Sequence, residues 1–130
     1  MPGKIVYENQ GEGVVIIWGG SISGEGLKMV NAQIYTEGGS EKLRYQIWDF
    51  TNAEGLEITD HDLRDLAIQD KIASETNPKQ IIAIVGSIEL FRGYDRLFHI
   101  YEGVWSDYKS KTFRSMVEAR KWISRTMDGG

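Results

Sequence analysis

Two short, uninterrupted apolar runs constrain the fold of this chain more than any other feature. Val14–Trp18 is apolar at every position, and so is Ile81–Val85, the centre of the segment Gln80–Gly86. Runs of this length that are rich in β-branched residues indicate strands covered on both faces. Such strands belong to mostly parallel sheets that have helices on both sides. The sequence therefore predicts an α/β fold with Ile81–Val85 as its central strand.

The segments between these runs predict the remaining elements. Further strands are expected at Ile5–Glu8, Tyr45–Phe50 and Lys111–Phe113, with a glycine-bearing hairpin joining the first two strands and Gly19-Gly20 ending the second. Helices are expected over the regions of Leu27–Ile34, Thr59–Asn77, Leu90–Trp105 and Ser115–Ile123. The order β-β-α-β-α-β-α-β-α predicts a mixed, mostly parallel sheet with an antiparallel N-terminal edge strand and four helices. We expect residues 1–130 to form a single domain.

Helix starts and buried faces are also readable. Thr59 with Asp62 and Ser115 with Glu118 have the spacing of a capping box, in which side chain and backbone bond reciprocally across three residues. The expected buried faces are Leu27, Val30 and Ile34; Leu63, Leu66, Ala67 and Ile72; Leu90, Tyr94, Leu97, Phe98, Tyr101 and Trp105; and Met116, Ala119, Trp122 and Ile123. Four amphipathic helices are therefore available to cover the sheet.

Composition excludes several classes of function. The chain has no cysteine, which rules out a disulfide scaffold, thiolate metal sites and a cysteine nucleophile. Its net charge of −4 argues against general binding of nucleic acid, which requires neutralised phosphates. No apolar stretch suits a signal peptide or approaches the roughly 20 residues of a membrane span. We expect a cytoplasmic protein.

The two histidines and the glycine-rich segment give little indication of a metal site or a phosphate site. His61 and His99 lack nearby partners at metal-ligand spacing, so no metal or other cofactor is expected. We expect His61 on a solvated first helical turn and His99 in a half-exposed structural position. The segment Gly19–Gly26 follows a strand and leads into a helix, yet it fits neither phosphate-binding glycine pattern, and Glu25 would repel a phosphate.

Positive charge is concentrated near the C-terminus. Residues 109–125 carry six cations and one carboxylate, a net charge of +5 that leaves −9 on the rest of the chain. The six are Lys109, Lys111, Arg114, Arg120, Lys121 and Arg125, and Arg92 and Arg96 could extend this surface. Two interpretations stay open: a surface for an anion or an acidic partner, or cations that favour the negative end of the last helix and face solvent.

Three segments of the chain resemble the small bacterial SpoIIAA-like family of STAS-type domains. They are Ile82–Gly86, Leu90–Leu97 with its Gly93 and Arg96, and the run Phe113–Ile123. Asp49-Phe50-Thr51 also resembles a family strand that ends in Asp before a long loop. The resemblance implies a SpoIIAA-like sheet packed with helices, and kinship to anti-sigma-factor antagonists and to the STAS regions of anion transporters. It also implies a domain that binds proteins or small ligands and is not an enzyme.

The family's phosphorylation switch is not matched here. The resemblance places a Ser or Thr in an Asp-Ser-x-Gly type motif at the start of the helix after the third strand. This chain has Ile58-Thr59-Asp60-His61 there, and Thr59 is expected to be an N-cap.

Three hypotheses for function follow. The first is a regulatory or protein-interaction module that presents a loop at residues 51–59, with Asp49, Thr51, Thr59, Arg92, Arg96 and Arg114 as candidate binding residues. The second is a carrier of a small apolar ligand or lipid, similar to the Sec14 fold, lined by Tyr94, Phe98, Tyr101 and Trp105. The third is an enzyme that uses Asp49 and His61 at the carboxyl edge of the sheet. The aromatic strip Tyr101–Tyr108 could also join two copies into a homodimer.

Overall fold

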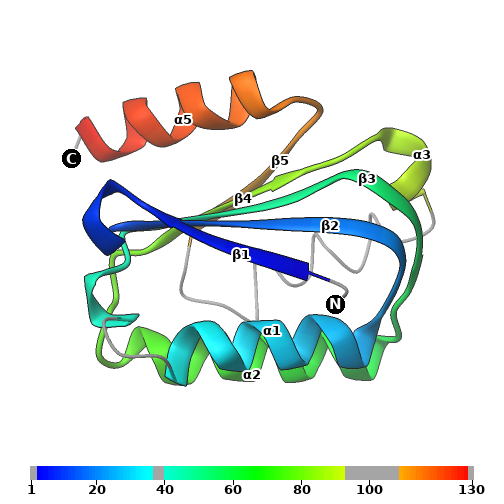
Figure 1. Ribbon diagram of the computed structural model, residues 1–130. Helices are drawn as coiled ribbons and strands as arrows, with labels where there is room; N and C mark the ends of the chain where they lie inside the picture. Colours follow the sequence, from blue (N-terminus) through cyan, green and yellow to red (C-terminus); the bar gives the residue numbers. More distant parts are fainter. Residues whose placement is uncertain (1–2, 37–39, 93–108, 129–130) are drawn as a thin grey trace.

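Five strands lie side by side in the order of the sequence (Figure 1). The computed structural model describes residues 3–36, 40–92 and 109–128. The strands are β1 (Gly3–Glu8), β2 (Gly13–Ser23), β3 (Tyr45–Glu57), β4 (Ile81–Val85) and β5 (Lys109–Phe113). β1 is antiparallel to β2, and β2 to β5 are mutually parallel. The predicted mixed sheet with an antiparallel N-terminal edge strand is confirmed.

The second and third strands are longer than the sequence predicted. β2 continues through Gly19 and Gly20, and it pairs with β3 as far as Ser23↔Glu57. The predictions that Gly19-Gly20 ends a strand and that residues 51–59 form a loop are therefore wrong. The glycines lie at register shifts of the ladder, and Gly20 has a positive φ of 68°. They accommodate local irregularities within a continuous strand, a role that glycine often has in sheets.

Helices cover both faces of the sheet (Figure 1). α1 (Gly24–Thr36) and α2 (Asp60–Ser74) pack side by side on one face, and α5 (Met116–Asp128) lies on the other. The short α3 (Ile88–Phe91) follows β4, and 3-10 turns follow β1 (Asn9–Gly11) and precede β3 (Ser40–Lys42). The remainder of the predicted Leu90–Trp105 helix, with its aromatic residues and His99, lies outside the described residues.

Two apolar clusters form the core, one on each face of the sheet. The larger cluster contains the α1 and α2 faces and three stacked or tilted rings, those of Trp18, Trp48 and Phe50. The smaller one packs Ala119 and Ile123 of α5 against β3 and β4. The predicted buried faces of α1, α2 and α5 are confirmed as a whole.

Three packing details differ from expectation. Ile72 is 62% exposed, because nine residues at about 100° each place it on the opposite side of α2 from Leu63. Ile17 is 37% exposed on β2, so only four of the five positions in Val14–Trp18 are buried. β4 is buried at every position, as predicted, but β3 and not β4 occupies the middle of the sheet.

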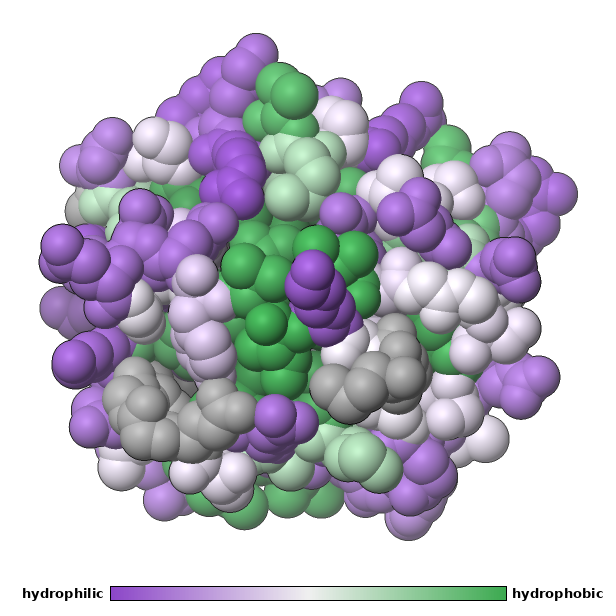
Figure 2. All heavy atoms as spheres, viewed as in Figure 1, coloured by the Kyte–Doolittle hydropathy of each residue, from purple (hydrophilic) through white to green (hydrophobic). Residues whose placement is uncertain are grey.

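The face of the molecule with β1 in front exposes a gathering of hydrophobic atoms near its middle, surrounded by hydrophilic residues (Figure 2). Val6 of β1 and Ile17 of β2 are each 37% exposed.

In the part of the chain that the structure describes, no helix is both long and apolar enough to cross a membrane.

Candidate functional site

The binding residues expected from sequence do not converge on one site. By strand register Asp49 is level with Val85 and Phe113, so Asp49 lies within β3 and Arg114 directly follows β5, with β4 between the two strands. Asp49 Oδ1 accepts hydrogen bonds from the backbone N–H of Thr51, at 3.0 Å, and from its hydroxyl. Arg92 ends α3 and is exposed, as is Arg114. Within the described residues, no hydrogen bond or ion pair joins either arginine to Asp49 or Thr51.

The remaining two candidate binding residues do not join Asp49 and Thr51 in the described structure either. Thr59 caps α2 and belongs to a different group of polar residues, described below. Arg96 lies outside the described residues.

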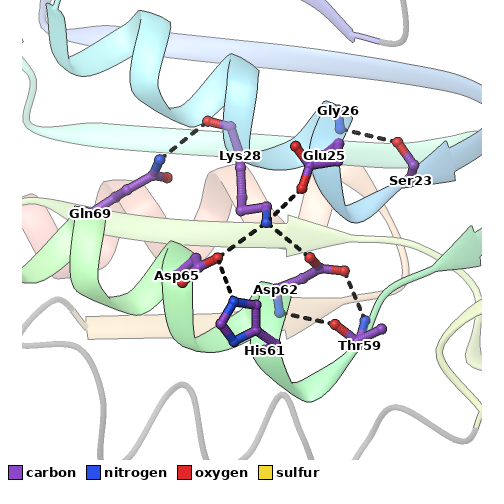
Figure 3. A network of polar contacts seen from close by, with 9 residues as sticks. All are labelled: Ser23, Glu25, Gly26, Lys28, Thr59, His61, Asp62, Asp65 and Gln69. Atoms are coloured by element: carbon purple, nitrogen blue, oxygen red, sulfur yellow. Dashed lines mark hydrogen bonds and ion pairs between the residues drawn. The ribbon is translucent and has the colours of Figure 1, made fainter.

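A polar network does form where α1 and α2 begin, next to the carboxyl ends of β2 and β3 (Figure 3). Lys28 lies at its centre, with Nζ 2.8 Å from Glu25, 3.0 Å from Asp62 and 3.1 Å from Asp65. Glu25 is one turn before Lys28 on α1, whereas the two aspartates lie one turn apart on α2. Hydrogen bonds to these carboxylates, that of Glu25 first, raise the pKa of Lys28. One cation therefore holds three carboxylates from two helices together.

Thr59 and Asp62 form the predicted capping box. Thr59 Oγ1 accepts from the backbone N–H of Asp62 at 3.1 Å, and Asp62 Oδ2 accepts from the backbone N–H of Thr59 at 3.0 Å. The bond from the Thr59 backbone, with a further contribution from Lys28, lowers the pKa of Asp62. Gly24 makes room for this carboxylate, since a Cβ there would lie 1.9 Å from Asp62 Oδ2. The sequence of both helix starts thus fixes the ionised Asp62 in place.

The outer rim of this network is acidic and open to solvent. We call Glu25, Lys28, Asp60, Asp62 and Asp65 the acidic surface; its four carboxylates and one cation give it a net charge of −3. The Glu25 side chain is 83% exposed, and Asp60 is exposed on the first turn of α2. His61 is 79% exposed, as predicted, with Nε2 3.5 Å from Asp65. Such a surface can accept hydrogen bonds and ion pairs from basic groups.

Metal binding has no support at this surface. No group of three or more His, Asp or Glu side chains in the described part of the chain is arranged to hold a metal ion. Glu25, Asp62 and Asp65 instead contact Lys28, and Asp62 also caps α2.

A second polar network, which no sequence motif indicated, is buried between the sheet and α1–α2. Asp70 is 1% exposed, and it accepts hydrogen bonds from Tyr35 Oη at 2.7 Å and from Asn31 Nδ2 at 3.2 Å. Gln46 Nε2 donates to Tyr35 Oη at 3.0 Å and also to Gln80, while Gln46 Oε1 accepts from the Trp48 indole at 2.8 Å. Burial raises the pKa of Asp70 to about 7. One signal was available: Asp70 lies seven residues after Leu63, on the buried face of α2.

Asp70 also lines a small apolar cavity among the core residues Leu27, Trp48, Phe50 and Ile84. Its volume is about 40 Å³. The aromatic residues expected to line a carrier pocket, Tyr94 to Trp105, lie outside the described residues.

Comparisons with known proteins establish the fold. No protein-family model matches the chain, and no curated protein sequence matches it. Among solved structures, the anti-sigma factor antagonist SpoIIAA in its unphosphorylated form superposes with a TM-score of 0.58 at 16% identity, covering 96% of this chain and 97% of that one. The fold is SpoIIAA-like.

Two further structures were found. The Bacillus cell fate determinant SpoIIAA in its phosphorylated form gives a TM-score of 0.53 at 15% identity, covering 93% of this chain and 98% of that one. An uncharacterised DUF3478-family protein from Shewanella loihica with a SpoIIAA-like fold gives 0.47 at 17% identity, covering 93% and 91%. The SpoIIAA-like fold expected from the resemblance is confirmed by the two SpoIIAA structures.

Proposed function

We propose that this protein is a non-catalytic regulatory module that binds a partner protein through its acidic surface. The observation that carries the proposal is the network centred on Lys28, which holds three carboxylates of α1 and α2 in a fixed arrangement. The SpoIIAA-like fold supports it, because the similar solved structure is that of an anti-sigma factor antagonist. A net charge of −3, with Glu25 and Asp60 exposed at its rim, favours a partner with a basic contact face.

The acidic surface lies where the STAS-type resemblance places a phosphorylation switch, but its negative charge comes from side-chain carboxylates. A phosphate on Thr59 would add about two negative charges beside Asp60 and Asp62, where like charges repel it. The Thr59 hydroxyl oxygen also accepts the hydrogen bond that caps α2. We infer that partner binding here depends on permanent carboxylates and not on phosphorylation of Thr59.

The arrangement of the candidate catalytic residues favours a module without enzymatic activity. Asp49 accepts a hydrogen bond from Thr51 on β3, and His61 lies next to Asp65 on the solvent side of α2. No contact between Asp49 and His61 is present in the described structure that would make an acid–base pair. The acidic surface is better suited to recognition than to proton transfer.

Site-specific photocrosslinking in the native host tests the proposal. A photoreactive phenylalanine analogue replaces the exposed His61, and a matched control replaces Lys121 on α5, which covers the opposite face of the sheet. We expect one discrete adduct from position 61 and none of the same mass from position 121.

Charge variants decide whether the carboxylates cause the adduct. The double variant Glu25→Lys with Asp60→Lys should abolish it, whereas Glu41→Lys with Glu75→Lys, the same charge change away from the acidic surface, should preserve it. Equal loss in both variants, or identical adducts from both crosslinking positions, would refute the proposal.

A further inference from the structure

A second, oppositely charged feature lies at the other end of the sheet from the acidic surface. It is a cavity of about 520 Å³ lined by four cationic side chains, those of Arg44, Lys79, Lys109 and Arg125, together with Ile81, Thr126 and Met127. None of these lining residues is acidic. We call this feature the basic cavity.

Strand topology explains why cations distant in sequence meet there. Arg44 directly precedes β3, Lys79 stands two residues before β4, and Lys109 is the first residue of β5. Parallel strands begin at one edge of a sheet, and the pairs Tyr45↔Ile81 and Ile81↔Lys109 align these three starts. α5 runs back over the sheet toward the same edge (Figure 1), so Arg125 in its last turn becomes the fourth cation.

These charges are not neutralised within the described structure. None of the four side chains has a hydrogen bond or ion pair to another described residue, whereas Lys28 contacts three carboxylates and Arg120 contacts Glu8. The neighbouring carboxylate Asp128 lines a different hollow, next to Arg120. Attraction to the negative end of α5 accounts for Arg125 only, because the other three cations precede or begin strands. Four cations without a partner among the described residues are thus concentrated at one edge of the sheet, in a chain of net charge −4.

We propose that the basic cavity binds a small molecule that carries two or more phosphate groups. Its volume falls within the range of about 300–1,000 Å³ typical of small-ligand sites. Arginine binds phosphate through paired N–H donors and lysine as a point charge, so two of each suit several phosphate oxygens. Ile81 and Met127 add apolar surface for the carbon skeleton that carries the phosphates. This site is independent of the proposed partner-binding function.

Isothermal titration of the full chain with inorganic pyrophosphate tests the proposal. We expect saturable 1:1 binding that weakens as salt is raised, and weaker binding of inorganic phosphate, which carries fewer charges. The double variant Lys79→Gln with Lys109→Gln should bind pyrophosphate at least about tenfold more weakly, since each lost charged hydrogen bond is worth about that factor. The matched control is Lys111→Gln with Lys121→Gln, which removes the same charge from the C-terminal basic stretch outside the cavity and should change affinity less than about twofold.

A second arm distinguishes soluble ligands from lipid headgroups. Sedimentation with phosphatidylcholine vesicles containing phosphatidylinositol bisphosphate, reversed by pyrophosphate and lost in the cavity variant, would assign the phosphates to a lipid. Pyrophosphate binding without sedimentation would assign them to a soluble molecule.

The four cations of the basic cavity are exposed, so they can be changed without removing core contacts. Circular dichroism checks that each variant is folded. The proposal is overturned if the folded wild-type chain shows no saturable binding of pyrophosphate, or if the control variant loses as much affinity as the cavity variant.

Discussion

Replacing Asp70 with Asn should remove a specific component of the pH dependence of stability. Asp70 is buried in the larger core cluster, and desolvation raises the pKa of its carboxyl to about 7. Asn is nearly the same size and stays neutral at every pH. Its amide oxygen can still accept the hydrogen bonds from Tyr35 and Asn31.

The expected size of the effect follows from proton linkage. In the unfolded chain the carboxyl has its ordinary pKa of 3.8, so between there and about 7 the folded protein binds a proton that the unfolded chain has released. Folding stability due to Asp70 is therefore complete below about pH 4 and falls as pH rises through this window. At about 1.4 kcal/mol per pH unit, the loss reaches at most about 4 kcal/mol by pH 7. Wild type and Asp70→Asn should be similarly stable at low pH, and the variant more stable at pH 8.

Urea unfolding followed by tryptophan fluorescence measures this difference, because Trp18 and Trp48 are buried in the same cluster. Free energies of unfolding are determined for both proteins at pH 5, 6, 7 and 8 and subtracted. Asp60→Asn, which removes an exposed carboxylate of the same helix, is the control and should follow the wild-type slope. A variant Asp70→Asn that retains the wild-type dependence on pH across this range would contradict this linkage.

Substitutions at three other positions test the local interactions. Gly24→Ala places a Cβ 1.9 Å from Asp62 Oδ2 and should cost about 1–3 kcal/mol in unfolding free energy; an unchanged melting temperature would argue against the close approach. Thr59→Ala should cost about 1 kcal/mol by removing the cap of α2, while Thr59→Ser should not, and equal losses in thermal melts would exclude capping as the cause. The bond from Arg120 lowers the pKa of Glu8, so this pair contributes stability above pH 4.5 that is lost as pH falls through the folded value. Glu8→Gln should cost less than about 1 kcal/mol at pH 7 because the pair is partly exposed, and the cost should shrink in 1 M salt rather than persist.

Local signals in the sequence predicted local structure well. The Thr59–Asp62 box, the hairpin and the buried run at β4 each depend on neighbouring residues, and all are present. Gly19-Gly20 misled because glycine ends a strand or accommodates an irregularity within it, and the choice depends on a partner strand 33 residues later. Asp70 was missed for a related reason, since its hydrogen-bond partners Asn31 and Tyr35 lie on α1 and are not visible in α2 alone.

The functional surfaces required tertiary contacts that no contiguous segment encodes. The basic stretch of residues 109–125 suggested one cationic surface, but the fold divides it: Glu8 neutralises Arg120, and Lys111 lies 5.7 Å from the centre of the Phe113 ring. The acidic surface likewise joins residues of two helices through Lys28, which the sequence did not single out.

The separation of charge between the two ends of the sheet follows from the direction of its parallel strands. Carboxyl ends of strands lead into α1 and α2, whose first turns favour acidic residues because the helix N-terminus is positive. Strand starts have no such preference, and three of them, with the returning end of α5, carry the cations of the basic cavity. Exposed charges separated by more than about 10 Å are largely screened at 0.1 M salt, so ligands at opposite ends of the sheet interact weakly through charge alone. Any effect of pyrophosphate on crosslinking at position 61 in physiological salt would therefore have to pass through a change in the sheet or its helices, which makes the combined experiment a direct measure of coupling between the two sites.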